Sequence, residues 1–246
     1  MCTVTYIPIS KTDFILTSSR DVPFAREKAL LPKIYMDGDV AITYPKDGKA
    51  GGSWIGHSDK KRLICLLNGG FKSHYLTTPS TIKYRKSRGL IVLDLLKVTD
   101  INSALSKIDL SNIEPFTLVI VDWNTTTNSV DNLQLIELVW DGVQKHITAL
   151  PQKHHIWSSS TLYDTTMKKM RKDWFVELQN SFCPKHISKT ELNNLYKSRI
   201  LNFHRKAGIG DCNVDVLMKR EKVGTVSITQ VNKLNNEIIM DYEEVK

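Results

Sequence analysis

Apolar and polar residues alternate with period two along most of the first third of the chain, a pattern that indicates short β-strands. Turn-rich segments at 10–13, 45–52 and 58–60 separate the predicted strands, which cover 3–9, 14–18, 40–44, 53–57 and 62–68. A second group of strands is predicted at 116–122, 133–140, 145–150 and 155–159, and two final strands at 224–231 and 237–242. The Asp141-Gly142 dipeptide between two of these runs is typical of a hairpin turn.

Four helices are predicted between the groups of strands, and each follows a Ser or Asp that can cap it. They cover 88–97 after Ser87, 101–108 after Asp100, 165–182 after Asp164 and 189–203 after Ser188. Ser188 and Glu191 together form a capping box. Because short turns rather than crossover helices join successive strands, we expect antiparallel sheets with helices packed outside, an α+β layered fold. Rossmann and TIM-barrel folds are excluded, since both alternate strands and helices strictly.

The chain of 246 residues is long enough for one large domain or two small ones. Hydrophobic residues make up 41% and charged residues 24%, as in ordinary globular proteins. No break in composition and no linker divides the sequence, so we predict one domain over residues 1–246. No apolar run approaches the ~18 residues of a membrane span, and no transmembrane segment is expected.

The chain is basic, with 34 Lys and Arg against 26 Asp and Glu and a net charge of +8. Neither a helix-turn-helix pattern nor the aromatic sheet motif of an RNA-recognition domain is present, so no nucleic-acid partner is expected. The N-terminus lacks the basic start and long apolar run of a secretory signal. A cytoplasmic location is therefore the expectation.

The four cysteines do not form a metal-binding pattern, since no pair is spaced as CxxC and no histidine follows at zinc-finger spacing. No metal site is predicted. Cys65 lies within an apolar run and is expected in the core. Cys2 differs, because removal of Met1 before its small side chain would leave an α-amine and a thiol on one residue.

If the first two strands form a hairpin, Cys2 meets Arg20 and Asp21 at one edge of the sheet. Arg20 could lower the pKa of the thiol and hold a substrate carboxylate or carbonyl, and Asp21 could orient the α-amine. A free α-amine has a pKa near ~8 in model peptides, which suits a general base. The alternative is that Cys2 is a small strand residue and that Arg20 and Asp21 are a solvated turn pair.

Six segments in a fixed order carry a family pattern. They are MCTVTYIP (1–8), FILTSSRD (14–21), GGSWIG (51–56), LLNGG (66–70), HIWSSSTLY (155–163) and GTVS (224–227). Together they resemble the NRDE family, also called the transport and Golgi organisation protein 2 family. The family's Asn-Arg-Asp-Glu signature reads Ser19-Arg20-Asp21-Val22 here, so the role of its Glu does not carry over.

The resemblance implies a four-layer αββα sandwich of antiparallel sheets, similar to the N-terminal-nucleophile hydrolases. In the cysteine branch of that superfamily the first Cys attacks an amide, and an Arg and an Asp follow at the end of the second strand. Cys2, Arg20 and Asp21 match those positions. Asn68, before two glycines, is the candidate donor of an oxyanion hole; the alternative is a turn residue in the left-handed conformation.

The resemblance also implies a second class of function, because family members are associated with haem trafficking and with lipid or acyl-CoA metabolism. Haem would then be a cargo with a Cys or a His as its axial ligand. The candidates are His57, His74, His154, His155 and His204. A basic segment at 83–88 could attract the haem propionates or be a solvated loop. The expected ligand is therefore haem or a small acyl or amide compound, and the hydrolase alternative requires no cofactor.

The basic segment 167–174 could lie on a membrane surface as an amphipathic helix. The simpler interpretation is that Met170 and Trp174 pack inward while the lysines face water.

Overall fold

The computed structural model describes residues 3–73, 82–124, 133–181 and 187–245. Cys2, His74 and Cys183 lie outside these ranges. By its contacts the chain divides into two compact units, of which the first comprises residues 1–26, 153–158 and 163–246, and the second residues 27–152 and 159–162. Each unit is described by itself, and one domain over 1–246 stays a prediction.

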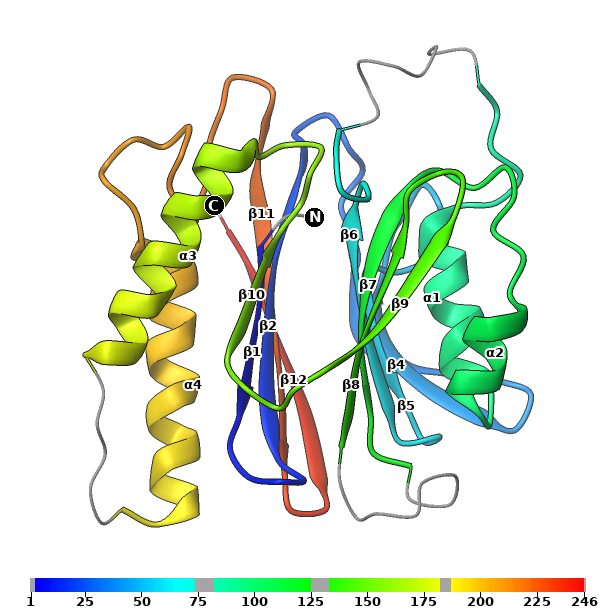
Figure 1. Cartoon of the computed structure of the whole chain (residues 1–246), viewed down its shortest axis with the longest axis horizontal. Coiled ribbons are helices and arrows are strands. Elements are labelled where there is room, and N and C mark those ends of the chain that lie inside the picture. Colours follow the sequence, from blue (N-terminus) through cyan, green and yellow to red (C-terminus); the bar gives the residue numbers. More distant parts are fainter. Residues whose placement is uncertain (1–2, 74–81, 125–132, 182–186, 246) are drawn as a thin grey trace. The chain divides into compact units, whose positions relative to one another are not determined.

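The first unit is a five-stranded antiparallel sheet with the order β10-β1-β2-β11-β12. Its strands are β1 (Thr3–Pro8), β2 (Phe14–Pro23), β10 (His155–Ser158), β11 (Val223–Leu234) and β12 (Glu237–Glu244). Two helices, α3 (Thr165–Asn180) and α4 (Lys189–Lys206), lie over one face of this sheet (Figure 1). The central strand β2 is buried over its first eight residues.

Both helices begin where the sequence predicts. The Asp164 carboxylate accepts a hydrogen bond from the backbone N–H of Met167, and Ser188 and Glu191 form the reciprocal capping box. A cluster of buried apolar side chains joins the helices to the sheet: Ile7, Ile15, Phe175, Ile200, Phe203 and Val216.

The buried stripe of α3 differs in part from the prediction. Trp174 packs against the apolar cluster as expected, but the most buried side chains of the helix are Arg171 and Phe175. Met170 is half-buried. A buried arginine interrupts the apolar pattern of this helix, so the periodicity of apolar residues does not reveal the face that packs inward.

The second unit is a seven-stranded antiparallel sheet with strands β3 to β9 in chain order. These are β3 (Leu30–Asp37), β4 (Val40–Lys46), β5 (Ile55–Ser58), β6 (Arg62–Asn68), β7 (Phe116–Asp122), β8 (Gln134–Trp140) and β9 (Lys145–Leu150). Helices α1 (Arg88–Lys97) and α2 (Ile101–Lys107) lie on one face of the sheet (Figure 1). Cys65 is fully buried in β6, as predicted.

A buried ion pair links this sheet to α1. Arg62 donates from Nε and Nη2 to one oxygen of Asp122, at 3.0 and 2.7 Å, and both side chains are almost fully buried. Arg62 Nη1 also donates to the carbonyls of Leu95 and Val98 at the end of α1. Arg62 therefore supplies hydrogen-bond donors to carbonyl groups at the C-terminal end of α1, which have no donor within the helix itself.

The caps of α1 and α2 differ. Asp100 accepts hydrogen bonds from two backbone N–H groups of α2, as predicted, whereas the Ser87 side chain makes no capping bond to α1. Strand β3 was not predicted, because its Leu-Leu-Pro start breaks the period-two pattern.

The two antiparallel sheets with their helices confirm the α+β fold class. Within the described ranges, no helix has the length and apolar character required to span a membrane.

Candidate functional site

Arg20 and Asp21 lie inside strand β2 and not in a turn after it. They are 3% and 2% exposed, respectively. The alternative of a solvated turn pair is therefore wrong. Because side chains alternate along a strand, Arg20 points to the opposite face of the sheet from its neighbours Ser19 and Asp21.

Strand pairing brings the start of the described chain next to this pair. Thr3 is the Cα partner of Ser19 in the β1–β2 ladder, so the hairpin of the first two strands is confirmed. Cys2 lies outside the described residues, but it is joined to Thr3 by a single peptide bond. The predicted nucleophile is therefore covalently attached to the residue that faces Ser19.

The carboxylate of Asp21 is held at both oxygens. Tyr163 Oη donates to Oδ2 and Thr225 Oγ1 donates to Oδ1, each at 2.6 Å. These hydroxyls come from the segment before α3 and from strand β11, more than a hundred residues away in sequence. Two charge-assisted bonds fix the orientation of the carboxylate more firmly than either would alone.

Arg171 of α3 contacts the ring of Tyr163, whose hydroxyl binds Asp21. Its guanidinium carbon lies 3.6 Å from the centroid of the Tyr163 ring, a cation–π contact. The guanidinium donates to Thr3 Oγ1 and to the carbonyls of Val214 and Asp215. The side chain is fully buried, and within the described part of the chain it has no carboxylate partner.

His204 of α4 forms a second buried polar contact to the hairpin. Its Nδ1 lies 2.7 Å from Ser19 Oγ, and its Nε2 lies 2.9 Å from Thr5 Oγ1. In the neutral ring one nitrogen donates and the other accepts. Burial, together with the nearby positive charge of Arg171, lowers the pKa of His204 to about 3. The ring is therefore neutral at physiological pH.

This neutral histidine predicts acid lability. Between its ordinary pKa of 6.5 and about 3, the unfolded chain takes up a proton on His204 while the folded protein does not. The free energy of unfolding should therefore fall as the pH decreases through this window, by about 1.4 kcal/mol per pH unit from this group. Urea denaturation at several pH values measures it.

His57 provides the matched control for this acid lability. Burial lowers its pKa to about 4, so it contributes in the same direction over a narrower window. Between pH 6.5 and about 4, His204→Gln and His57→Gln should each show a flatter decline in stability than the wild type, and between about 4 and about 3 only His204→Gln should still be flatter. Equal slopes for wild type and His204→Gln would contradict the assignment.

The Arg20 face of the sheet carries hydroxyls from the neighbouring strand. Ser227 and Thr229 of β11 are the register partners of Arg20 and Ser18, and a bulge shifts the ladder between Thr225 and Ser227. Ser227 Oγ and Thr229 Oγ1 are buried and have no hydrogen-bond partner among the residues described. Buried hydroxyls without partners are uncommon and are candidates for contact with water or a ligand.

Asn68 is the last residue of β6 and belongs to the second unit. It does not have the left-handed conformation that the alternative interpretation required; Gly69, with φ +83°, has it. Ser159 Oγ donates to the Asn68 carbonyl at 3.0 Å. A side chain at position 69 would collide with Ser160, because a Cβ added to Gly69 would lie 2.2 Å from Ser160 Oγ. A common site of Asn68 with Arg20 and Asp21 stays a prediction.

The histidines suggested for haem have different surroundings. Both ring nitrogens of His204 are engaged, so neither is available to a metal. His154 packs edge-on against Tyr196, His155 stacks on Trp157, and His57 is half-buried in β5. No cluster of three or more His, Cys, Asp or Glu that could hold a metal ion occurs in the residues that the structure describes.

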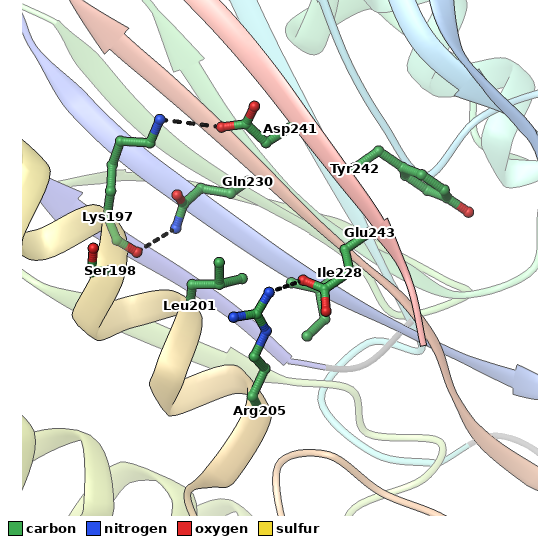
Figure 2. A pocket seen from close by; sticks show the side chains of 9 residues that line it. All are labelled: Lys197, Ser198, Leu201, Arg205, Ile228, Gln230, Asp241, Tyr242 and Glu243. Carbon is green, nitrogen blue, oxygen red and sulfur yellow. Dashed lines mark hydrogen bonds and ion pairs between the residues drawn. The ribbon is translucent and has the colours of Figure 1, made fainter. Parts of the chain in front are cut away.

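A separate pocket of about 400 Å³ lies between α4 and strands β11 and β12 (Figure 2). Lys197 and Arg205 reach from α4 toward Asp241 and Glu243 of β12, and Lys197 Nζ lies 3.2 Å from Asp241. Gln230 donates to the Lys197 carbonyl at 3.2 Å. None of the residues predicted for catalysis lines this pocket.

The sequence did not reveal Tyr163, Arg171, His204 and Thr225 as parts of one arrangement. Tyr163 and Thr225 fall within two of the family segments, HIWSSSTLY and GTVS, which was the available signal. Arg171 gave no signal, because a basic residue on a basic helix is expected in water.

One comparison with a solved structure agrees with this fold. That structure is the Caenorhabditis elegans ortholog of N-acylethanolamine-hydrolyzing acid amidase, with a TM-score of 0.62 and 11% identity over 93% of this chain and 92% of the other. Two variants of conjugated bile acid hydrolase from Clostridium perfringens match at a TM-score of 0.49 each, with 10% and 11% identity over 100% of this chain and 97% of theirs.

A search of curated protein sequences gives no match. The family model described as Transport and Golgi organisation 2 matches residues 1–221. This match covers most of the chain and includes all six segments except the last, which carries Thr225. The chain therefore belongs to the Transport and Golgi organisation 2 family.

Proposed function

We propose that this protein is an N-terminal cysteine amidohydrolase that acts on a linear amide or acyl substrate. The observation that carries the proposal is the strand pairing of Thr3, which a peptide bond joins to Cys2, with Ser19, which directly precedes the buried Arg20 and Asp21. A nucleophile that is activated by its own α-amine needs neighbouring groups that orient the amine and bind the substrate, and Asp21 and Arg20 are the candidates for these roles.

The proposed reaction begins once Met1 is removed. The α-amine of Cys2 takes the thiol proton, and the thiolate attacks the amide carbonyl. The C–N bond of the resulting tetrahedral intermediate breaks, and the leaving amine takes the proton from the α-ammonium group. Water then attacks the thioester, which releases a carboxylic acid and restores the thiol. Asn68 is the proposed donor to the oxyanion.

The roles proposed for the buried residues are supported by their contacts and by the face of the sheet on which they lie. Asp21, held by Tyr163 and Thr225, orients the α-amine. Arg20 lowers the pKa of the thiol or binds the substrate carbonyl. Ser227 and Thr229, on the same face as Arg20, offer two unpartnered hydroxyls to a polar group of the substrate.

Hydrolysis of N-acylethanolamines tests the proposal, since the C. elegans protein with the similar fold is named as an ortholog of an amidase that hydrolyses that class of amide. Mass spectrometry of the intact protein should give the mass of a chain that lacks Met1. The wild type should hydrolyse the substrate, and the rate should fall to background in Cys2→Ala. Cys212→Ala, which changes an exposed free cysteine, is the matched control and should keep full activity. Retention of Met1 would contradict the mechanism.

Haem handling is the competing function. A titration with haem on wild type and Cys2→Ala separates the two. A Soret shift without Cys2-dependent hydrolysis of any amide in an acyl-chain series would favour haem handling, whereas Cys2-dependent release of a fatty acid would favour the hydrolase.

A further inference from the structure

Strand β3 at the edge of the seven-stranded sheet exposes more apolar surface than an edge strand normally does. Ile34 and Met36 are 67% and 65% exposed, and Leu30 and Leu31 are 54% and 63% exposed. In the described chain β3 pairs with β4 alone. About half of its backbone N–H and C=O groups therefore face away from any strand, and such an edge is a template for another strand.

The two faces of β3 have different character. Tyr35 stacks on Tyr44 with ring centroids 4.4 Å apart, and Asp37 accepts a hydrogen bond from Lys97 of α1 at 2.8 Å, so these side chains lie on the α1 side of the sheet. Ile34 and Met36 alternate with them and point to the other face. The exposed apolar pair is thus on one face and the charged side chains are on the other.

The sequence of β3 is complementary to itself about Tyr35. Antiparallel pairing with a second copy, centred on Tyr35, sets Lys33 opposite Asp37 of that copy and Ile34 opposite its Met36. Each pair occurs twice because the arrangement has two-fold symmetry. Two attractive charge pairs then form on one face, and four apolar side chains meet on the other.

The structure also sets the limits of this pairing. Pro32 cannot donate a ladder hydrogen bond, and the β3–β4 register shifts between Leu30 and Lys33. The complementary segment is therefore residues 33–37.

The edge strand β12 of the other sheet lacks this property. It is as long as β3, but antiparallel pairing with itself about its centre would set Glu237 opposite Glu244 and Ile238 opposite Glu243. Like charges directly opposite each other disfavour pairing.

We propose that β3 is a homodimerisation strand, which pairs antiparallel with β3 of a second copy about a two-fold axis at Tyr35. The proposal is independent of the catalytic activity of the protein.

Sedimentation velocity of the full chain over a concentration series tests it. The wild type should show a monomer–dimer equilibrium. Lys33→Asp and Asp37→Lys each turn two attractions into two repulsions, so each should weaken the dimer by about tenfold or more. An equimolar mixture of the two variants should recover the dimer, because each supplies the charge that the other lacks.

Ile34→Lys tests the apolar contact of the dimer, and Ile239→Lys is its matched control. Ile34→Lys places a charge in the apolar contact and should abolish the dimer, whereas Ile239→Lys, at a 47% exposed site on β12, should leave it intact. Circular dichroism verifies that each variant is folded. A monomeric wild type at all concentrations, or charge-reversed variants that dimerise as tightly as the wild type, would overturn the proposal.

Discussion

Replacing Asp21 by asparagine should lower the rate of Cys2-dependent amide hydrolysis by about 10²- to 10⁴-fold, because the α-amine that acts as general base then loses the carboxylate that orients it. Asparagine has nearly the same shape but no charge, and its amide nitrogen cannot accept a hydrogen bond. One of the two hydroxyl bonds, from Tyr163 or from Thr225, is therefore lost together with the attraction for the α-ammonium group. Steady-state kinetics with the amide substrate measure kcat and KM.

A graded pair of variants separates orientation from charge. Tyr163→Phe removes one hydroxyl bond to Asp21 and keeps the carboxylate, so its loss of kcat should be smaller, about tenfold. If Asp21→Asn and Tyr163→Phe had equal effects, the charge of Asp21 would not matter. If Asp21→Asn kept full kcat, the role of Asp21 in the reaction would be refuted.

Replacing Asp122 by asparagine should destabilise the protein by about 3–5 kcal/mol, because it leaves the buried Arg62 guanidinium without a counter-charge. The free energy of unfolding from chemical denaturation measures this loss. The double variant Arg62→Met with Asp122→Leu should recover part of it, since an apolar pair removes both buried charges.

The exposed ion pair between Lys169 and Asp173 on α3 is the matched control. Asp173→Asn removes a carboxylate of the same kind at the surface, where such a pair contributes less than about 1 kcal/mol. A loss of similar size for Asp122→Asn and Asp173→Asn would show that the burial of Arg62 does not govern its contribution.

The elements with the strongest local patterns were predicted closely. The bounds of β6, β7 and β9 agree with the sequence prediction, as does the end of α1 at Lys97. Their apolar runs and flanking turns act within a few residues, so they are visible without tertiary structure. Strand β3 was missed because Pro32 interrupts its pattern.

The candidate site was predicted in part. The spacing of the first two strands correctly placed Arg20 and Asp21 near the start of the chain, since a hairpin is a local structure. The burial of this pair depends on β11, which covers the other edge of β2. That neighbour lies about two hundred residues away, and no local pattern identifies it.

The sequence by itself determined the strands other than β3, the caps of α2, α3 and α4, and the position of Cys2 one residue before a strand that folds back to Arg20 and Asp21. Only the tertiary structure decided that Tyr163 and Thr225 hold Asp21, that Arg171 and His204 are buried against β1 and β2, and that β3 pairs with β4 alone among the described strands. The physical reason is range. Alternation and capping act within one or two turns of chain, whereas partners of buried polar groups are set by the order and register of strands that are distant in sequence.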